Sequence, residues 1–227
     1  MHLTLSAVRE FAGGSLVHGF LFVALALFPI VNPIGMAPIF LQYTGDLEDP
    51  VAKRLARRVA INSFVLAVAA LIIGPYVLKF FGLSLPAVQI AGALVIAFAG
   101  WRLLNQDQAE GERRAADVSP ESLLRGAFYP LTLPFTIGPG SIAVLVALGG
   151  DLPYVSAAPS ELLETVGEIV AIAALCLAVY ICYSRAEVIF KRLGPTGVNV
   201  LLRLSAFILL CIGVQIAIEA FRGLAPR

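Results

Sequence analysis

Two short segments of the chain set proline, glycine and small polar residues into otherwise apolar runs. The residues that could contact a ligand are Asn32, Pro33 and Gly35 in the first segment and Thr136, Gly138, Pro139, Gly140 and Ser141 in the second. A helix that stops and restarts there presents free N–H groups, the positive end of its dipole and free carbonyl groups. Amide groups suit a carboxylate and carbonyls suit an ammonium group or Na⁺, so the two segments predict a site for a zwitterion.

The prolines of these segments follow the same spacing twice. They occur four and then five residues apart, with a constant offset of 101 residues between Pro29, Pro33 and Pro38 and Pro130, Pro134 and Pro139. Pro29, Pro38, Pro130 and Pro134 are interpreted as helix-breaking residues. Simple proline kinks are the alternative, but matched breaks at corresponding places are the best sequence indication of a transporter binding site.

The composition is that of a polytopic membrane protein. Hydrophobic residues make up 59% of the 227 residues and charged residues only 14%, which is far from the composition of a soluble domain. Apolar windows of spanning or near-spanning length fall at 15–41, 59–81, 86–104, 124–149, 166–184 and 199–220. The sequence therefore predicts an all-α fold of six transmembrane helices in a lipid bilayer, with broken helices in spans one and four.

The basic residues predict an orientation. Of the 16 Lys and Arg residues, 12 lie in three alternating connections, the first of which holds Lys53, Arg54, Arg57 and Arg58. The positive-inside rule places these connections in the cytoplasm and both termini outside. A net charge of +1, with the basic residues spread over the loops, gives no indication of a nucleic-acid partner.

The only long polar segment divides the chain into two halves. Residues 105–122 are interpreted as a cytoplasmic linker between a first three-helix repeat, 1–104, and a second, 123–227. Because three is odd, the second triplet must cross the membrane in the opposite sense. The shared proline spacing therefore predicts a 3+3 inverted-topology repeat, which is a common architecture among transporters.

The segments NPIGMAPIF (Asn32–Phe40) and PLTLPFTIGPGSI (Pro130–Ile142) resemble the two signature segments of the MarC/SnatA family of six-span bacterial membrane proteins. The resemblance covers nearly the whole chain. It implies a multi-pass inner-membrane secondary transporter with inverted repeats, and a substrate among small neutral amino acids such as glycine and alanine. It leaves open whether Na⁺ or H⁺ is a coupling ion and what the oligomeric state is, and no cofactor is expected. A passive channel for a small neutral solute is the alternative.

Several polar residues have two interpretations each. Asn32 could bind the substrate or an ion, or it could cap the restarted helix. The hydroxyls of Thr132, Thr136 and Ser141 could face the ligand or bond back to their own helix. Arg203, near the start of span six, could extend to the membrane interface or hold a helix end or gate.

Residues for covalent, metal or proton chemistry are sparse. The two histidines, His2 and His18, lie near the predicted outer side without carboxylates at metal-ligand spacing, so neither an enzyme nor a metal site is expected. Glu168 and Glu219 fall near outer ends of spans and Glu187 near an inner end, all interpreted as interfacial. Since no carboxylate lies at the centre of a span, a proton relay built on a central acid is not expected.

Overall fold

Helices make up all the regular secondary structure in the part of the chain that the computed structural model describes, residues 16–44, 47–105, 126–150 and 159–224. In chain order they are α2 (Leu16–Val31), α3 (Pro33–Thr44), α4 (Asp49–Phe81), α5 (Leu85–Leu104), η1 (Ala127–Thr136), α8 (Pro139–Gly150), α9 (Pro159–Ser184) and α10 (Ala186–Leu224). Five helical spans are long and apolar enough to cross a membrane, and the bent pair η1–α8 makes a sixth if it is counted as one span. The prediction of an all-α polytopic membrane protein is confirmed.

Two helices extend well beyond their apolar windows. α4 begins at Asp49, ten residues before the window at 59, because charged residues form helix readily outside the hydrocarbon core. It ends at Phe81, the φ of 65° at the following Gly82 forms a left-handed turn, and the Leu83 N–H donates to the Leu78 carbonyl at 2.9 Å. α10 is interrupted at Gly194 (φ 67°, ψ 170°), and its membrane-span candidate covers Thr196–Arg222.

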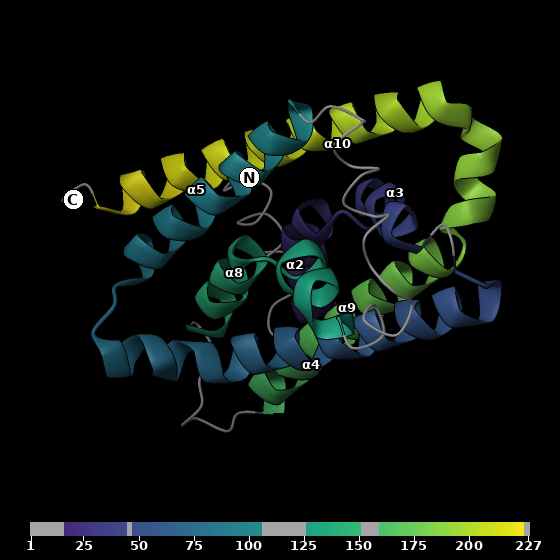
Figure 1. The fold of residues 1–227 in the computed structure, drawn as a ribbon. Coiled ribbons are helices and arrows are strands. Elements are labelled where there is room, and N and C mark those ends of the chain that lie inside the picture. Colours follow the sequence, from purple (N-terminus) through teal and green to yellow (C-terminus); the bar gives the residue numbers. More distant parts are fainter. Residues whose placement is uncertain (1–15, 45–46, 106–125, 151–158, 225–227) are drawn as a thin grey trace.

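The helices form three layers, with the two broken spans in the middle. α5 and α10 lie side by side along one face, and α4 and α9 pack against each other on the opposite face (Figure 1). Between them, α2 and α3 contact α9 and α10, whereas η1 and α8 contact α4, and α8 also contacts α5. The arrangement places both proline-broken spans between two layers of unbroken helix, which is where interrupted backbone is tolerated in a membrane protein.

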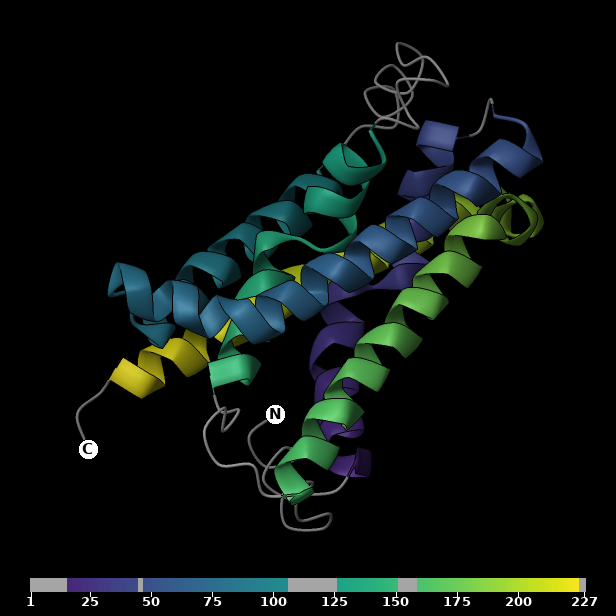
Figure 2. The ribbon, with the colours of Figure 1, turned by 90° about the horizontal axis from the view of Figure 1, so that it is seen from below.

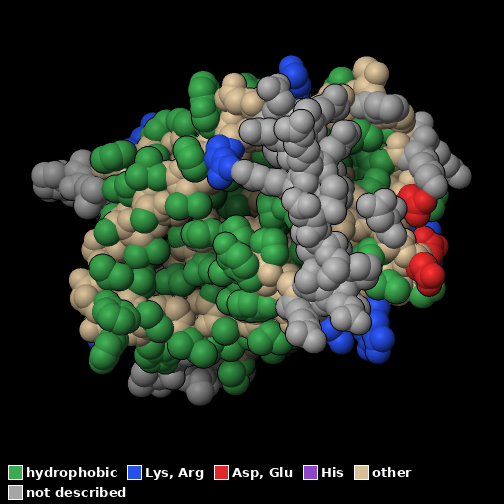
Figure 3. All heavy atoms as spheres, in the orientation of Figure 1, with side chains coloured by type: hydrophobic (Ala, Val, Ile, Leu, Met, Phe, Trp, Pro, Cys, Tyr) green, Lys and Arg blue, Asp and Glu red, His purple; other side chains and the backbone are tan. Residues whose placement is uncertain are grey.

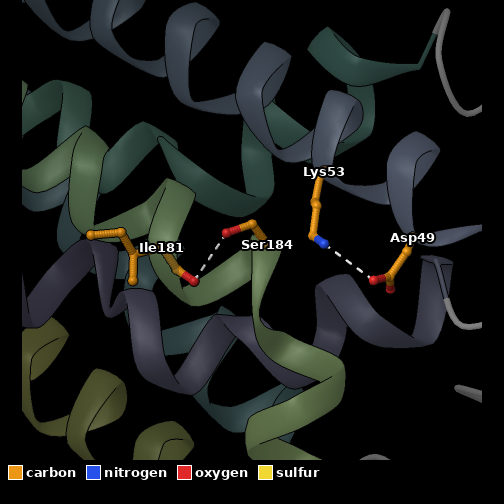
Figure 4. Close-up of polar contacts among 4 residues, drawn as sticks. All are labelled: Asp49, Lys53, Ile181 and Ser184. Carbon is orange, nitrogen blue, oxygen red and sulfur yellow. Dashed lines mark hydrogen bonds and ion pairs between the residues drawn. The ribbon is translucent and has the colours of Figure 1, made fainter.

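The described helix ends fall at two opposite ends of the bundle. α3, α5 and α9 finish at the end where α4, η1 and α10 begin, and α2 starts at the other end, where α10 finishes (Figure 2). The first of these is the end predicted to face the cytoplasm. There the Lys53 ammonium group lies 3.1 Å from the Asp49 carboxylate, and the Ser184 hydroxyl donates to the Ile181 carbonyl at 3.3 Å (Figure 4).

The orientation of the bundle in the membrane stays a prediction. Most of the predicted linker 105–122, both chain termini and residues 151–158 lie outside the described residues. The division into repeats at 1–104 and 123–227 likewise remains an interpretation of the sequence.

The outer surface and the contact between α5 and α10 both fit a bilayer. Hydrophobic side chains cover most of the face seen in Figure 3, and the acidic side chains visible there gather at its right-hand edge. α5 and α10 approach so closely that a Cβ atom on Gly100 would lie 2.6 Å from the Leu210 nitrogen, and one on Gly213 would lie 2.6 Å from the Ala97 nitrogen. Small residues at such contacts are characteristic of helix packing in membranes.

Candidate functional site

The first break, between α2 and α3, is made by a single residue. Asn32 has a φ of 43°, in the left-handed region that asparagine tolerates better than most residues. Its backbone N–H still donates to the Phe28 carbonyl at 2.9 Å, and its own carbonyl accepts from the Met36 N–H at 3.0 Å. Its side-chain oxygen accepts from the Gly35 N–H at 3.1 Å, which is an N-cap bond to the new helix. The structure thus shows the capping role of Asn32, and its role as a ligand stays a prediction.

A residue of α10 faces this break. A Cβ atom on Gly35 would collide with Asn32 Nδ2 and Ser205 Oγ and would lie 2.6 Å from Ser205 Cβ. Ser205 is buried, with 8% of its surface exposed, and it brings a hydroxyl group to the start of α3. Ser205 could not be singled out from the sequence, because a lone serine in an apolar span carries no distinctive signal. Arg203, for which the sequence predicts an interfacial or a gating role, is exposed and lies two residues earlier on α10.

The second break, between η1 and α8, is a longer irregular segment. Tyr129 (φ −127°, ψ 123°) and Leu133 (φ −112°, ψ 124°) are extended, and both directly precede a proline, which disfavours helical backbone at that position. Ile137 is also extended, and the two helical pieces meet at an angle of 69°. α8 then starts at Pro139, and the Ile142 N–H donates to the Gly138 carbonyl at 3.0 Å.

Two threonine hydroxyls bond back to the helix in this segment. Thr132 Oγ1 donates to the Ala127 carbonyl at 2.7 Å and Thr136 Oγ1 to the Leu131 carbonyl at 2.8 Å, in each case five residues earlier. Both threonines are almost fully buried. Of the two interpretations made from the sequence, back-bonding is therefore the one that the structure shows for Thr132 and Thr136. Ser141 is buried as well, with 2% of its surface exposed.

Gly140 packs against α5. A Cβ atom there would collide with the Ile96 side chain and would lie 3.3 Å from the Gly92 carbonyl oxygen. A Cβ atom on Gly92 would in turn lie 2.5 Å from Ala143 Cβ. The need for glycine at position 140 therefore has a packing cause, since Ile96 fills the space beside it.

The two broken spans pass each other in opposite directions. α2 contacts α8, and α3 contacts η1, so the part of each span before its break meets the part of the other after its break. The two breaks consequently lie at a similar level of the bundle. Each nevertheless has its own partner in the outer layer, since Gly35 faces Ser205 of α10 whereas Gly140 faces Ile96 of α5.

An aromatic cluster joins the broken spans on the predicted cytoplasmic side of the breaks. The Tyr183 hydroxyl lies 3.2 Å from Thr136 Oγ1, and the Tyr183 ring stacks on Phe40 with the ring centroids 4.6 Å apart. Tyr43 and Phe135 make a second ring contact at 5.7 Å. Sequence reasoning missed Tyr183, because a tyrosine near the end of a span is equally typical of the aromatic belt at the membrane interface.

Comparisons with known proteins agree with this architecture. A family described as "MarC family integral membrane protein" matches residues 17–225. An inner membrane protein named MarC from Salmonella typhimurium is 28% identical over 200 residues, covering 86% of this chain and 90% of the relative. A membrane protein named YvbG from Bacillus subtilis is 30% identical over 206 residues, covering 90% and 94%. No solved structure matches.

The matched region contains both proline-broken spans and every described helix almost in full. The resemblance first noted in the segments Asn32–Phe40 and Pro130–Ile142 thus extends from the start of α2 to the end of α10. This multi-pass membrane protein, with its paired helix breaks, belongs to the MarC family.

Proposed function

We propose that the protein is a secondary transporter for small neutral amino acids of the glycine and alanine class, in a bacterial inner membrane. The observation that carries the proposal is the placing of both helix breaks in the middle layer, at a similar level, between two layers of unbroken helices. Interrupted backbone at membrane depth is tolerated where it is enclosed by protein or lines a watery cavity. A midplane substrate site formed by two discontinuous helices is a recurrent transporter architecture.

The chemistry of the breaks supports a zwitterionic substrate without a charged side chain. The starts of α3 and α8 supply the positive ends of two helix dipoles for a carboxylate. The carbonyls of Asn32 and Gly138 and the side-chain oxygen of Asn32 each accept one bond within the chain, so their second lone pairs, together with the Ser205 hydroxyl, are the oxygen acceptors for the ammonium group or a coupling cation. The segments Asn32–Gly35 and Gly138–Ser141 contain no ionisable side chain, and Ser205 carries no charge. A substrate with a charged side chain would therefore find no counter-ion among these residues.

The different packing partners of the two breaks support an inverted repeat. Span one packs on span six through Gly35 and Ser205, and span four packs on span three through Gly140 and Ile96. A two-fold axis in the membrane plane would relate these two contacts. In such a transporter one pair of contacts loosens as the other tightens, which alternates access to the site. Under this proposal both termini lie outside and the 105–122 linker is cytoplasmic.

A passive channel is the second candidate, and the absence of ionisable side chains at either break is the feature that favours it. Purified protein in liposomes separates the candidates. A transporter gives saturable uptake of labelled glycine and exchange of labelled for unlabelled glycine, whereas a channel gives fast, unsaturable flux. We propose that the substrate crosses chemically unchanged, and chromatography of the liposome contents tests this, since a converted product would indicate an enzyme. Failure of glycine, alanine and serine to exchange would refute the transporter.

A further inference from the structure

On the side of the breaks that is predicted to face outside, α2 and α9 meet through glycine. A Cβ atom on Gly19 would collide with the Glu164 carbonyl oxygen. One on Gly167 would collide with the Leu16 carbonyl oxygen. His18 Nδ1 also lies 2.5 Å from a carboxylate oxygen of Glu164. The backbones of the two helices are therefore in direct contact at this level, as is typical of glycine at helix contacts in membranes.

The second broken span makes a contact of the same kind on this side. A Cβ atom on Gly149 of α8 would collide with the Leu71 carbonyl oxygen of α4 and would lie 3.1 Å from Pro75 Cγ. Glu168, which the sequence predicts to lie at the membrane interface, is instead buried inside the helix bundle, with 4% of its surface exposed. Each broken span is thus held to an unbroken helix by close backbone packing on the outer side of its break.

On the predicted cytoplasmic side, side chains make the contact of α9 with the broken spans. The Tyr183 ring of α9 stacks on Phe40 of α3, and the Tyr183 hydroxyl lies 3.2 Å from Thr136 Oγ1 of η1. All three side chains are buried, with 4% of Tyr183, 2% of Phe40 and 1% of Thr136 exposed. Among the described glycines, none brings the backbone of α9 against that of α3 or η1. The two sides of the breaks are therefore closed by different kinds of contact.

Tyr183 joins both broken spans, and it does so next to the second break. The single proton of Thr136 Oγ1 is donated to the Leu131 carbonyl at 2.8 Å, so the Tyr183 hydroxyl must donate to Thr136 Oγ1. Thr136 is the last residue of η1, and the extended Ile137 follows it directly. Phe40 lies on α3, after the first break. One side chain of α9 thus holds the end of η1 by its hydroxyl and α3 by its ring.

The two kinds of contact differ in how readily they open. Separating two backbones in direct contact requires whole helices to move apart. A stacked pair of rings and one hydrogen bond are released by a small tilt of α9 or by a change of side-chain rotamer. If α9 tilts about its glycine contact with α2, its outer end stays packed while Tyr183 moves away from Phe40 and Thr136.

We propose that Phe40, Thr136 and Tyr183 form the gate between the helix breaks and the predicted cytoplasmic end of the bundle. The proposal rests on the transport function proposed above and assigns the residues that control passage on that side. Tyr43 of α3 and Phe135 of η1, whose ring centroids are 5.7 Å apart, add a second contact between the broken spans there. In this structure the gate is closed, and it opens when α9 separates from α3 and η1.

The first test measures closure without transport. The three cysteines of the chain are replaced by alanine, and Ser205→Cys introduces a single buried thiol beside the start of α3. The rate at which a polar thiol reagent modifies it in detergent reports access to the first break, whichever way the bundle faces. Loss of the stacked ring favours the open state, so we expect Phe40→Ala to raise this rate about tenfold. Phe40→Leu keeps most of the volume and tests the same ring if the alanine variant does not fold.

Phe22→Ala is the matched control for this test. Phe22 is a half-buried aromatic residue on the outer side, where it stacks on His18 at 5.9 Å between ring centroids. Its loss leaves the gate and the glycine contacts in place, so the rate should stay that of the unaltered gate. Tyr183→Phe keeps the ring and removes the hydroxyl, so its rate should be intermediate. An unchanged rate in folded Phe40→Ala or Phe40→Leu protein would overturn the gate.

The second test locks the gate during transport. In the cysteine-free protein, Phe40→Cys and Tyr183→Cys are joined by a short bis-thiol reagent that reduction cleaves, and glycine exchange is measured in liposomes. We expect cross-linking to abolish exchange and reduction to restore it, whereas each single-cysteine variant keeps its own rate under the same treatment. Exchange that continues in fully cross-linked protein would refute the gate and leave the transporter standing. Absence of glycine exchange in the wild type would refute the transporter itself, and the gate with it.

Discussion

The two helix breaks share one proline spacing but not one geometry. At the first, Asn32 alone departs from helical backbone, and Leu16–Leu41 still passes as one span. At the second, the backbone is extended at Tyr129, Leu133 and Ile137, and the two helical pieces meet at 69°. The same three prolines at the same intervals therefore produce a capped interruption in one span and a bend in the other.

The difference shows that neighbours of the prolines decide the form of a break. Residues before proline are disfavoured in helical backbone, yet Phe28 and Ala37 remain helical whereas Tyr129 and Leu133 do not. Asn32 resets the helix in one residue because its side chain both tolerates a positive φ and caps the Gly35 N–H. The second break has no such residue, and hydroxyl groups bond to the carbonyls of its irregular turns instead.

The side chains that pack against the two breaks also differ in polarity. The first meets a polar side chain, Ser205, whereas the second meets an apolar one, Ile96. We therefore expect the first break to be more sensitive to changes of polar groups and the second to changes of volume.

The largest effect is expected from Gly140→Val at the second break. The new side chain would collide with Ile96, and overpacking of this kind typically costs about 1–3 kcal/mol. Thermal unfolding in detergent measures it. Ile96→Ala in the same protein should restore part of the loss, because it vacates the space that the valine needs. Wild-type stability of Gly140→Val would show that α5 and α8 are not packed as described.

Asn32→Ala should lower the free energy of unfolding by about 1–2 kcal/mol, because the cap to α3 is lost and alanine is disfavoured at a φ of 43°. Asn32→Gly is the matched control, since glycine accepts the backbone and should cost only a few tenths of a kcal/mol. Glycine binding to both variants, measured by calorimetry, separates capping from ligand contact. If Asn32→Gly is stable yet does not bind, the side chain contacts the substrate; if it binds normally, the role of Asn32 is structural.

Thr136→Val should lower the free energy of unfolding by about 1 kcal/mol, because it removes the hydrogen bond to the Leu131 carbonyl and the contact with the Tyr183 hydroxyl. Thr132→Val, which removes a bond within the same helix, is the control. Adding Tyr183→Phe to Thr136→Val should cost little more, because both partners of the side-chain contact are then absent. Fully additive losses in this double-mutant cycle would mean that the two hydroxyl groups are not coupled.

The smallest effect on stability is expected from Ser205→Ala, within a few tenths of a kcal/mol, because the change keeps the volume of a small side chain beside Gly35. Its effect on glycine affinity should be larger than that of Ile96→Val, the conservative change at the corresponding contact of the second break. Equal affinities for the two variants would remove the polar distinction between the breaks.

Local features of the sequence were enough to determine much of this protein. Apolar length located the spans, and proline located both breaks, because hydrogen bonding within a helix involves residues only a few positions apart. Capping of the restarted helix by Asn32 was also among the interpretations that the sequence offered, and the structure identifies the capped group as the Gly35 N–H. The segment from Asp49 to Arg58 was not recognised as part of a helix, because a hydropathy window reports depth in lipid and not helical backbone.

Contacts between helices were decided only by the tertiary structure. The sequence gives no indication that Ser205 faces Gly35, that Ile96 fills the space beside Gly140, or that His18 meets Glu164. Each contact depends on how two helices far apart in the chain rotate and slide against each other, and glycine sets how closely they approach. That geometry minimises the packing energy of the whole bundle, so it is not encoded in any single span. The sequence by itself therefore determined where the helices break, and the packing of the three layers decided which side chains meet the breaks.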